Sequence, residues 1–460
     1  MGSAGLVAAE FAATLDLRIA AVERDRVGGD CLWTGCVPSK ALLASAKVAH
    51  RMRTADEYGI VGVEPQVDGA RVFDRIHSIQ QEIAETDDSP ERYREMGVEF
   101  HFGHARLTGP HTVRVGEDEE LRGRFILLCT GSRPVVPPIE GLEEAGCLTS
   151  ETVWDLDRPP NSLVAIGGGP ISVEMSQAFR RLGTEIHTLQ KGPRILPRDE
   201  PTLVDVLVER LRGEGVDLCL NVRTEKVTVE NGTKVVHGTQ DGEPKTWGGE
   251  EILVGVGRRP NIEGLGLEQV GIATGPRGVT VDERMRTNVK SIYAAGDVAG
   301  RYLFTHSAGY EAVRAIRDMF FPGKGKFTAV VPWCTFTDPE LAHAGLTPAE
   351  AEEKHGGDDV EIWRRDLSHS DRARAEGAPE GAIVVVTHKK RVVGAHILAP
   401  AAGEMIHELV LAMHEDVKFD EVASAIHVYP TVSIGIGQLA GEAAFESAQR
   451  YRWLVKRSKG

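Results

Sequence analysis

The sequence predicts an α/β protein in which two similar strand–turn–helix–strand units are followed by a C-terminal α+β segment. Two observations favour this fold class. A glycine-rich unit recurs with matching spacing in the first two-thirds of the chain. In the last third, strands are expected near Ala382–Thr387 and Val392–Leu398 and an amphipathic helix around Glu404–Met413. The chain has 460 residues, enough for about three domains with several buried cores.

The clearer of the two units lies in the centre of the chain. The apolar run Leu163–Ile166 is typical of a short buried strand, and a glycine-rich turn follows it. A helical pattern then continues through Arg181, and Glu185–Leu189 is expected to form a second strand. The N-terminus of such a helix presents backbone N–H groups and a positive dipole end to a pyrophosphate, although the turn taken alone could equally be a tight turn without a ligand. The candidate phosphate contacts are Gly167, Gly169 and Ser172.

The start of the chain repeats this unit. Gly2 and Gly5 open a helical stretch over Leu6–Leu15, and Arg18–Val22 is expected to be the following strand. When Gly2 is aligned with Gly169, the last glycine of the central turn, a further small residue comes three positions later in both units. It is Gly5 in the first unit and Ser172 in the second. Both strands end 21 positions after the aligned glycine. Matching spacing in two units predicts two Rossmann-like dinucleotide-binding domains.

Each unit is later followed by a strand that ends in a Gly-x-Arg-Pro turn. These turns add three candidate cofactor-binding residues, namely Thr130, Gly131 and Gly257.

The alignment also places the first glycine of the N-terminal unit just before Met1, together with the strand that should precede it. We therefore expect a truncated chain start. A chain that begins at Met1 is expected to bind its first dinucleotide weakly, because a central parallel strand and part of the phosphate turn are missing.

The residues at the two strand ends indicate which dinucleotide each unit binds. Glu23 ends the first strand, and its carboxylate can accept the ribose hydroxyls but would repel a 2′-phosphate, which fits FAD. Gln190 occupies the same place in the central unit and is followed by Lys191 and Arg194. Two cations without a repelling carboxylate favour NADPH over NADH. Gln190 can also bind a ribose hydroxyl, and the two cations could be solvated loop residues.

A pair of cysteines lies between the first unit and the next helix. Cys31 and Cys36 are separated by four residues, preceded by Gly28 and Gly29 and followed by Lys40. This spacing allows a disulfide at a distorted helix start, where the helix N-terminus and Lys40 would stabilise a thiolate. Zinc binding would need a second ligand pair at suitable spacing, and the other cysteines are isolated. Two buried packing cysteines are the remaining alternative.

The segment Gly-Gly-x-Cys-x-x-x-x-Cys-Val-Pro-Ser-Lys, placed between two dinucleotide units, resembles the pyridine nucleotide–disulfide oxidoreductases. This is the family of dihydrolipoamide dehydrogenase, glutathione reductase and mercuric reductase. The resemblance covers essentially the whole chain. It includes Ile292–Asp297, similar to the family's second flavin motif, and Trp333–Leu346, similar to the start of its C-terminal dimer-interface domain. It implies an FAD domain at 1–147 and 275–325, an NAD(P) domain at 148–274 and an α+β dimerisation domain at 326–460.

The resemblance also implies roles for single residues. Cys31 would be the thiol that exchanges with the substrate, and Cys36 the thiol beside the flavin. Lys40 would approach the flavin and pair with Glu174, and Asp297 would hold the ribityl hydroxyls. Glu174 could instead be an exposed first-turn helix residue, and Asp297 a helix cap. The implied reaction passes hydride from NAD(P)H through FAD to the disulfide and on to an acceptor.

One part of the family pattern is missing near the C-terminus. Family members carry a His-Pro pair and a Glu four residues after that proline, whereas this chain has Tyr429 in place of the histidine and Ile434 in place of the glutamate. A phenol with a pKa near 10 is a poor acid–base shuttle at neutral pH. His427 could substitute, although a packed or surface histidine is the simpler interpretation. Mercuric reductases carry a tyrosine in this region, but the end of this chain, Trp453–Gly460, has no vicinal cysteine pair.

The sequence therefore predicts an FAD-dependent NAD(P)H oxidoreductase acting on a soft metal ion, a quinone or a small disulfide. The alternatives are a dihydrolipoamide dehydrogenase and a degenerate, flavin-poor member without catalysis. The net charge of −15 argues against nucleic acid as a partner, and no apolar run is long enough to span a membrane. Six cysteines are too few for a disulfide-rich secreted scaffold, so we expect a cytoplasmic protein. The resemblance implies a homodimer.

Overall fold

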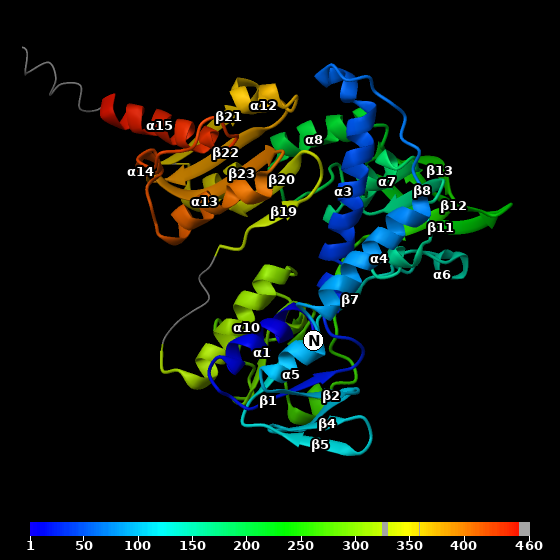
Figure 1. Ribbon diagram of the computed structural model, residues 1–460, viewed down its shortest axis with the longest axis vertical. Helices are drawn as coiled ribbons and strands as arrows, with labels where there is room; N and C mark the ends of the chain where they lie inside the picture. The colour runs from blue at the N-terminus through cyan, green and yellow to red at the C-terminus, as the bar shows by residue number, and fades with distance from the viewer. Residues whose placement is uncertain (324–329, 358, 450–460) are drawn as a thin grey trace, which may run out of the picture.

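The computed structural model describes residues 1–323, 330–357 and 359–449, so the end of the chain at 453–460 lies outside the described residues. Figure 1 shows three regions: an N-terminal region at the bottom, a central region at the right and a C-terminal region at the upper left. The mixed α/β architecture expected from the sequence is confirmed.

The N-terminal region contains two parallel strand pairs, a three-stranded antiparallel sheet and several helices. Its elements are α1 (Ser3–Ala13), β1 (Ile19–Glu23), α2 (Gly29–Trp33), α3 (Cys36–Arg53), α4 (Gly69–Glu85), α5 (Pro90–Glu95), β2 (Val98–Phe102), β3 (Ala105–Gly109), β4 (Thr112–Val115), β5 (Glu119–Arg122), β6 (Ile126–Leu128), β7 (Ser132–Pro134), β16 (Thr274–Gly275), β17 (Gly278–Val279), β18 (Ile292–Ala294) and α10 (Thr305–Phe320). β1 pairs with β2 and β6 pairs with β18, both in parallel. α1 lies beside α10, and small buried residues such as Ala8 and Ala312 allow the close packing.

The central region has a four-stranded parallel sheet in the order β10-β9-β8-β14 and a three-stranded antiparallel sheet. Its elements are α6 (Leu142–Ala145), β8 (Ser162–Ile166), α7 (Pro170–Arg181), β9 (Glu185–Leu189), α8 (Pro201–Gly213), β10 (Asp217–Cys219), β11 (Val222–Glu230), β12 (Thr233–Gln240), β13 (Glu243–Gly249), β14 (Glu251–Val254) and β15 (Arg258–Pro260). The next helix, α9 (Leu267–Val270), packs against β3 of the N-terminal region. The strands and the helix expected from the glycine-rich unit correspond to β8, α7 and β9. β15 pairs with β7 and so returns the chain to the N-terminal region.

The C-terminal region is a five-stranded antiparallel sheet, in the order β19-β20-β23-β22-β21, with helices packed on it. Its elements are β19 (Trp333–Thr335), β20 (Glu340–Gly345), α11 (Pro348–His355), β21 (Val360–Asp366), α12 (Asp371–Ala375), β22 (Ala382–His388), β23 (Arg391–Ala399), α13 (Ala402–His414), α14 (Phe419–Val422) and α15 (Ile434–Gln449). The expected strands near Ala382–Thr387 and Val392–Leu398 correspond to β22 and β23, and the expected helix corresponds to α13.

A buried ionic cluster joins the regions. Arg181, at the end of α7, has a side chain only 3% exposed, and it donates to Glu214 at 2.7 Å and to Asp338 at 2.9 Å. Lys47 of α3 pairs with the same Asp338 at 3.2 Å. Burial opposes ionisation of Glu214 and Asp338, but Arg181, together with Arg210 beside Glu214 and Lys47 beside Asp338, outweighs it and holds the pKa of both carboxyls below their ordinary values. Among the described residues, the Arg181 guanidinium is thus the one cation that contacts both carboxylates, while Arg210 pairs with Glu214 at 2.7 Å and Lys47 with Asp338.

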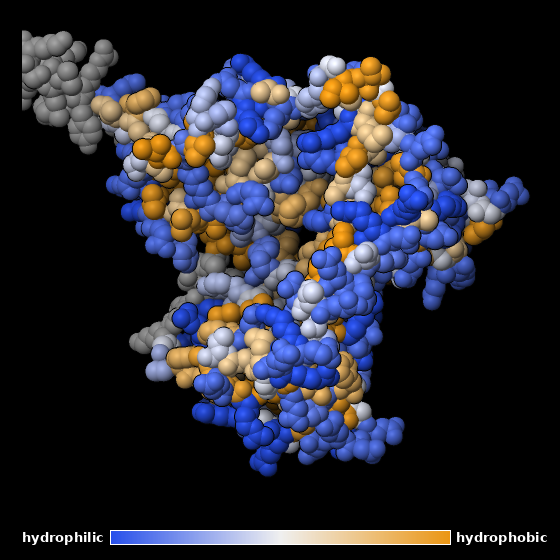
Figure 2. Space-filling model, viewed as in Figure 1, coloured by the Kyte–Doolittle hydropathy of each residue, from blue (hydrophilic) through white to orange (hydrophobic). Residues whose placement is uncertain are grey.

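The described surface is mostly polar, with apolar patches. One patch lies at the free end of α3 (Figure 2) and includes Val48, Ile60 and Val61, each more than half exposed. Within the described ranges, no helix has both the length and the apolar character needed to cross a membrane.

Candidate active site

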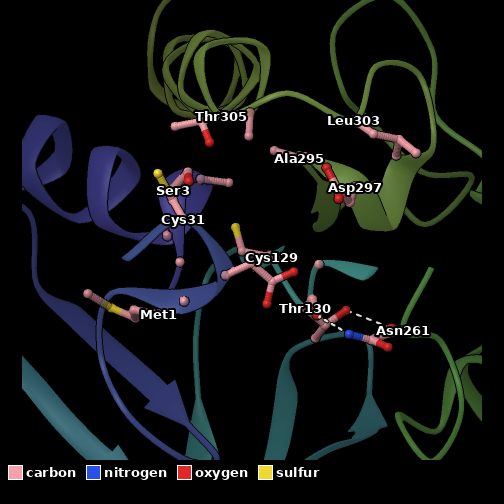
Figure 3. A pocket seen from close by; sticks show the side chains of 18 of the residues that line it. Met1, Ser3, Cys31, Cys129, Thr130, Asn261, Ala295, Asp297, Leu303 and Thr305 are labelled. Carbon is pink, nitrogen blue, oxygen red and sulfur yellow. Dashed lines mark hydrogen bonds between the residues drawn. The ribbon is translucent and has the colours of Figure 1, made fainter. Parts of the chain in front are cut away.

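A cavity of about 2650 Å³ lies where the N-terminal region meets the other two. It is larger than the ~300–1,000 Å³ typical of small-molecule pockets. Figure 3 shows its centre, with Cys31 and Thr305 on one side and Asp297 and the Thr130–Asn261 pair on the other. The cavity is lined by twelve of the residues singled out in the sequence: Gly2, Gly5, Glu23, Gly29, Cys31, Cys36, Lys40, Thr130, Gly131, Glu174, Gly257 and Asp297.

Gly2, at the N-terminus of α1, and Gly28 and Gly29, at the N-terminus of α2, form a glycine cradle that larger residues could not form. Gly29 has φ +59°, and a Cβ at this position would come within 2.4 Å of Gly2 Cα. Gly28, at φ +109°, donates its N–H to the carbonyl of Met1 at 2.8 Å. Two backbone turns therefore touch beside the N-terminus of α1, which is the kind of surface that lets a pyrophosphate approach the backbone. These residues fit a bound dinucleotide.

Glu23 ends β1 at the rim of the cavity. Its Oε1 accepts from the backbone N–H of Asp25 at 2.8 Å, and its Oε2 contacts the N-terminal ammonium of Met1. The carboxylate thus lies next to the turn and borders the cavity.

The two cysteines are free thiols on adjoining helices. Cys31 lies on α2, and Cys36 is the first residue of α3. Cys36 Sγ lies 3.6 Å from Thr305 Oγ1, at the N-terminus of α10. A hydrogen bond from Cys31, together with Thr305 and Lys40, outweighs burial and lowers the pKa of Cys36 to about 6. The same hydrogen bond, aided by burial, raises the pKa of Cys31. The pair therefore consists of one thiolate and one thiol near neutral pH.

We expect the alkylation rate of Cys36 in the reduced protein to rise through pH 6, whereas an ordinary thiol reacts only as the pH approaches about 8.5. The thiolate is the reactive species, so the rate falls when acid protonates it. Mass-spectrometric labelling with iodoacetamide across the acidic and neutral range measures this midpoint. Lys40→Met and Thr305→Ala each remove a stabilising group and are expected to move the midpoint to higher pH. A midpoint near that of a free thiol in the unaltered protein contradicts the assignment.

Lys40 and Glu174 lie in contact, although they come from α3 and α7. Lys40 Nζ donates to Glu174 Oε2 at 2.9 Å and lies 4.2 Å from the centre of the Phe336 ring. The other oxygen of Glu174 accepts from the backbone N–H of Phe336 at 2.9 Å. Glu174 is only 5% exposed, so it is not the exposed helix residue considered as the alternative. A buried carboxylate with both oxygens bonded holds the ammonium at the cavity wall.

Asp297 follows the positive-φ residue Gly296, and its carboxylate is partly buried. Its Oδ2 accepts from Ser132 Oγ at 2.5 Å, and burial raises the pKa of Asp297. Sequence reasoning missed Ser132. It also missed Asn261, whose side chain donates to the carbonyl of Thr130 at 3.0 Å and whose own carbonyl accepts from Thr130 Oγ1 at 2.7 Å. The two similar Gly-x-Arg-Pro turns were the signal that could have indicated this pairing.

The glycine-rich turn of the central region lies at the N-terminus of α7. Gly167 has φ +112°, Gly169 precedes the helix, and Ser172 is buried with a hydroxyl that has no hydrogen-bond partner among the described residues. Gln190 accepts from the N–H of Gly168 at 3.0 Å and donates to the carbonyl of Arg194 at 3.0 Å. The Gln190 amide therefore braces the turn. The two nearby cations differ in setting, because Lys191 is exposed and Arg194 pairs with Asp205 at 3.1 Å.

Tyr429 and His427 do not line the cavity. Tyr429 is 64% exposed, and its hydroxyl donates to Asp371 on α12 at 3.0 Å. His427 faces Glu408 at 2.8 Å through Nε2 and the carbonyl of Ala425 at 3.0 Å through Nδ1. Both ring nitrogens of His427 therefore have acceptors in their own chain, which agrees with a packed histidine.

Comparison with known proteins decides the family. Residues 1–312 match the family model for pyridine nucleotide–disulphide oxidoreductases, and residues 331–440 match the dimerisation domain of the same family. The chain belongs to the pyridine nucleotide–disulfide oxidoreductase family. It is an oxidoreductase of a family that uses FAD and NAD(P)H, and its C-terminal domain supports a homodimer.

Several relatives cover nearly the whole chain. A dihydrolipoyl dehydrogenase of Bacillus subtilis is 31% identical, with 95% of each chain covered. A mercuric reductase of Bacillus cereus is 30% identical over 95% of this chain and 69% of its own length. Among solved structures, LpdA from Mycobacterium tuberculosis has a TM-score of 0.88 at 27% identity, covering 96% of this chain and 98% of its own. The HOCl-induced flavoprotein disulfide reductase RclA from Escherichia coli has a TM-score of 0.85 at 26% identity, with the same shares covered.

Proposed function

We propose that this family member passes electrons from NAD(P)H through FAD and the Cys31–Cys36 pair to a soft metal ion, a quinone or a small disulfide. The observation that carries the proposal is the cavity itself, in which a thiol and a stabilised thiolate share one space with the candidate flavin-binding residues. The proposed domains are 1–147 with 275–325 for FAD, 148–274 for NAD(P) and 326–460 for dimerisation.

In this proposal, each residue around the cavity has a separate role. FAD supplies the two-electron chemistry between hydride and disulfide. Cys36, as the thiolate, would be the partner of the bound flavin, and Cys31 would keep its proton and exchange with the acceptor. When the dithiol closes to a disulfide, two electrons pass to the acceptor, and the proton of Cys31 is released. The Lys40 ammonium, held by Glu174, stabilises the negative charge that the thiolate and a reduced flavin carry.

The proposed acceptor class depends on Tyr429. Asp371 accepts the phenol's hydrogen bond and thereby raises the pKa of Tyr429, so the phenol stays protonated and can donate a hydrogen bond but cannot act as a base. In a homodimer Tyr429 would reach the partner's dithiol. A soft metal ion needs thiolate ligands and no acid–base shuttle, which favours it over a disulfide. The mercuric reductase relative and the RclA structures described as Cu(II) complexes give further support.

A dihydrolipoamide dehydrogenase is the second candidate. Several relatives that cover 95% or more of the chain carry the name dihydrolipoyl dehydrogenase, at 31 to 33% identity. Two observations argue against this candidate. Tyr429 and Ile434 replace the family's histidine and glutamate. Both ring nitrogens of His427 already have hydrogen-bond partners in their own chain.

An acceptor panel separates these functions. Anaerobic protein reduced with NAD(P)H is offered thiol-bound Hg(II), Cu(II), benzoquinone and lipoamide, and NAD(P)H oxidation is followed. We expect turnover with a metal ion or the quinone, little with lipoamide, and a loss of the metal-ion activity in Tyr429→Phe. Lipoamide as the best acceptor, unaffected by Tyr429→Phe, overturns the proposal. If none of the acceptors is reduced, the degenerate alternative gains support.

We propose NADPH as the preferred coenzyme. Replacing Lys191 and Arg194 together by alanine is expected to raise the KM for NADPH by about 10- to 100-fold, because a charge-assisted hydrogen bond contributes roughly 1.5–3 kcal/mol. The KM for NADH should change little, since NADH lacks the 2′-phosphate. Steady-state kinetics with both coenzymes measures the difference, and Arg223→Ala, an exposed cation on β11, is the control. If the KM values for NADPH and NADH rise equally, Lys191 and Arg194 do not recognise the 2′-phosphate.

A further inference from the structure

Arg258 lies where three parts of the cavity wall meet. It is the first residue of β15, directly after the second Gly-x-Arg-Pro glycine, and its side chain is only 16% exposed. Nε donates to Ser132 Oγ at 2.7 Å, and one terminal nitrogen donates to Ser150 Oγ at 3.2 Å. The other terminal nitrogen donates to the carbonyl of Ser132 at 3.0 Å and to the carboxylate of Asp30. The guanidinium thus contacts segments far apart in the sequence.

Two carboxylates of the cavity wall depend on this cation. Asp30 immediately precedes Cys31, and Asp297 is the candidate ribityl ligand. Arg258 Nε lies 3.8 Å from Asp297 Oδ2, and Ser132 Oγ, which accepts from Arg258, donates to the same oxygen. Burial raises the pKa of both carboxyls, and Arg258 counteracts that effect at each. Asp297 also acts to raise the pKa of Asp30, so the two carboxylates repel each other.

We infer that Arg258 is a positioning residue that fixes the turn bearing Cys31 to the Asp297 motif and neutralises two carboxylates that would otherwise repel bound FAD. Asp30 and Asp297 share one cavity with the glycine cradle at Gly2 and Gly29. Without the guanidinium, two uncompensated carboxylates would share this cavity with the dianionic pyrophosphate of bound FAD, and their charges would repel it. The same loss frees the turn before Cys31 from β15.

The charge of Arg258 and its hydrogen bonds can be tested separately. Removing Arg258 leaves both carboxylates uncompensated, whereas removing the charge of Asp30 at the same time relieves most of the repulsion. The double variant Arg258→Met/Asp30→Asn should therefore bind FAD better than Arg258→Met alone. Arg258→Lys keeps the charge but loses the forked hydrogen bonds, so it should lie between the two.

The experiment measures FAD binding to the flavin-stripped full chain by quenching of flavin fluorescence. Expected Kd values are about 10- to 100-fold higher for Arg258→Met, clearly recovered in the double variant, and within about threefold of the unaltered protein for Asp30→Asn. Arg259→Met, the exposed neighbour on β15, is the matched control and should not change the Kd. Circular dichroism and the Tm of each flavin-free variant establish that it is folded.

Two results overturn the inference. One is an Arg258→Met protein that binds FAD as tightly as Arg259→Met. The other is a double variant that binds no better than Arg258→Met, because the guanidinium would then act by contact alone. If Arg258→Met does not fold, Arg258→Lys and Asp30→Asn carry the test: FAD affinity in Arg258→Lys equal to that of the unaltered protein contradicts the forked contact. None of these outcomes depends on the terminal acceptor.

Discussion

Replacing Cys31 by serine is expected to lower acceptor turnover by more than about 1,000-fold while NAD(P)H still reduces the flavin at an unaltered rate. Serine cannot form the disulfide, so electrons that reach the flavin have no dithiol through which to leave. Cys36→Ser should have the same effect on turnover, and it also removes the thiolate beside Thr305. Rapid-mixing measurements of flavin reduction, compared with steady-state acceptor reduction, separate the two half-reactions.

Cys147 provides the control. It is a partly buried free cysteine that does not line the cavity, so Cys147→Ser should retain full turnover. Full acceptor turnover in Cys31→Ser would show instead that electrons pass directly from the flavin to the acceptor. A quinone needs no thiol exchange, so the acceptor panel should be repeated on this variant to test direct transfer to it.

Arg181→Met is expected to lower the free energy of unfolding by about 3–5 kcal/mol. The change removes from the buried Glu214 and Asp338 carboxylates the guanidinium that contributes most to lowering their pKa values, and leaves Arg210 and Lys47 as their remaining cationic partners. Desolvated carboxylates that lose their partner cost more than the transfer of a methionine side chain can return. Denaturant unfolding followed by fluorescence measures the shift, and the loss should be smaller at low pH, where protonation removes both charges.

Arg158→Met is the matched control for that variant. Arg158 pairs with Glu250 at 2.6 Å, but its side chain is 50% exposed, so its loss should cost less than about 1 kcal/mol. Equal destabilisation by the two substitutions would contradict the special role of burial. A loss confined to Arg181→Met supports the buried cluster as the tie between regions.

Much of the fold could be predicted from local pattern. The spacing shared by the two glycine-rich units indicated α1 with β1 and β8 with α7 and β9, and the ends differ from the structure by at most three residues. The strands and helix of the C-terminal region followed from apolar runs and helical periodicity in the same way. The positions of these helices and strands depend on residues that are close together in the chain, so a single sequence is enough to predict them.

The candidate site was only partly visible in the sequence. The cysteine pair and the glycines could be found because their chemistry depends on short spacing. Asp371 could not be matched with Tyr429, because 58 positions separate them and no local signal joins them. The resemblance placed Lys40 beside Glu174, but the burial of Glu174 and its bond to Phe336 emerge only when α7 meets the loop that follows β19.

The sequence by itself thus determined the class of the protein, its two dinucleotide units and its dithiol, because each depends on residue type and on spacing along the chain. The tertiary structure alone decided which charges balance one another. Arg258 meets Asp30 across 228 positions, and Arg181 meets Asp338 across 157. The energy of such pairs depends on distance and burial in three dimensions, and neither quantity can be read from the order of residues.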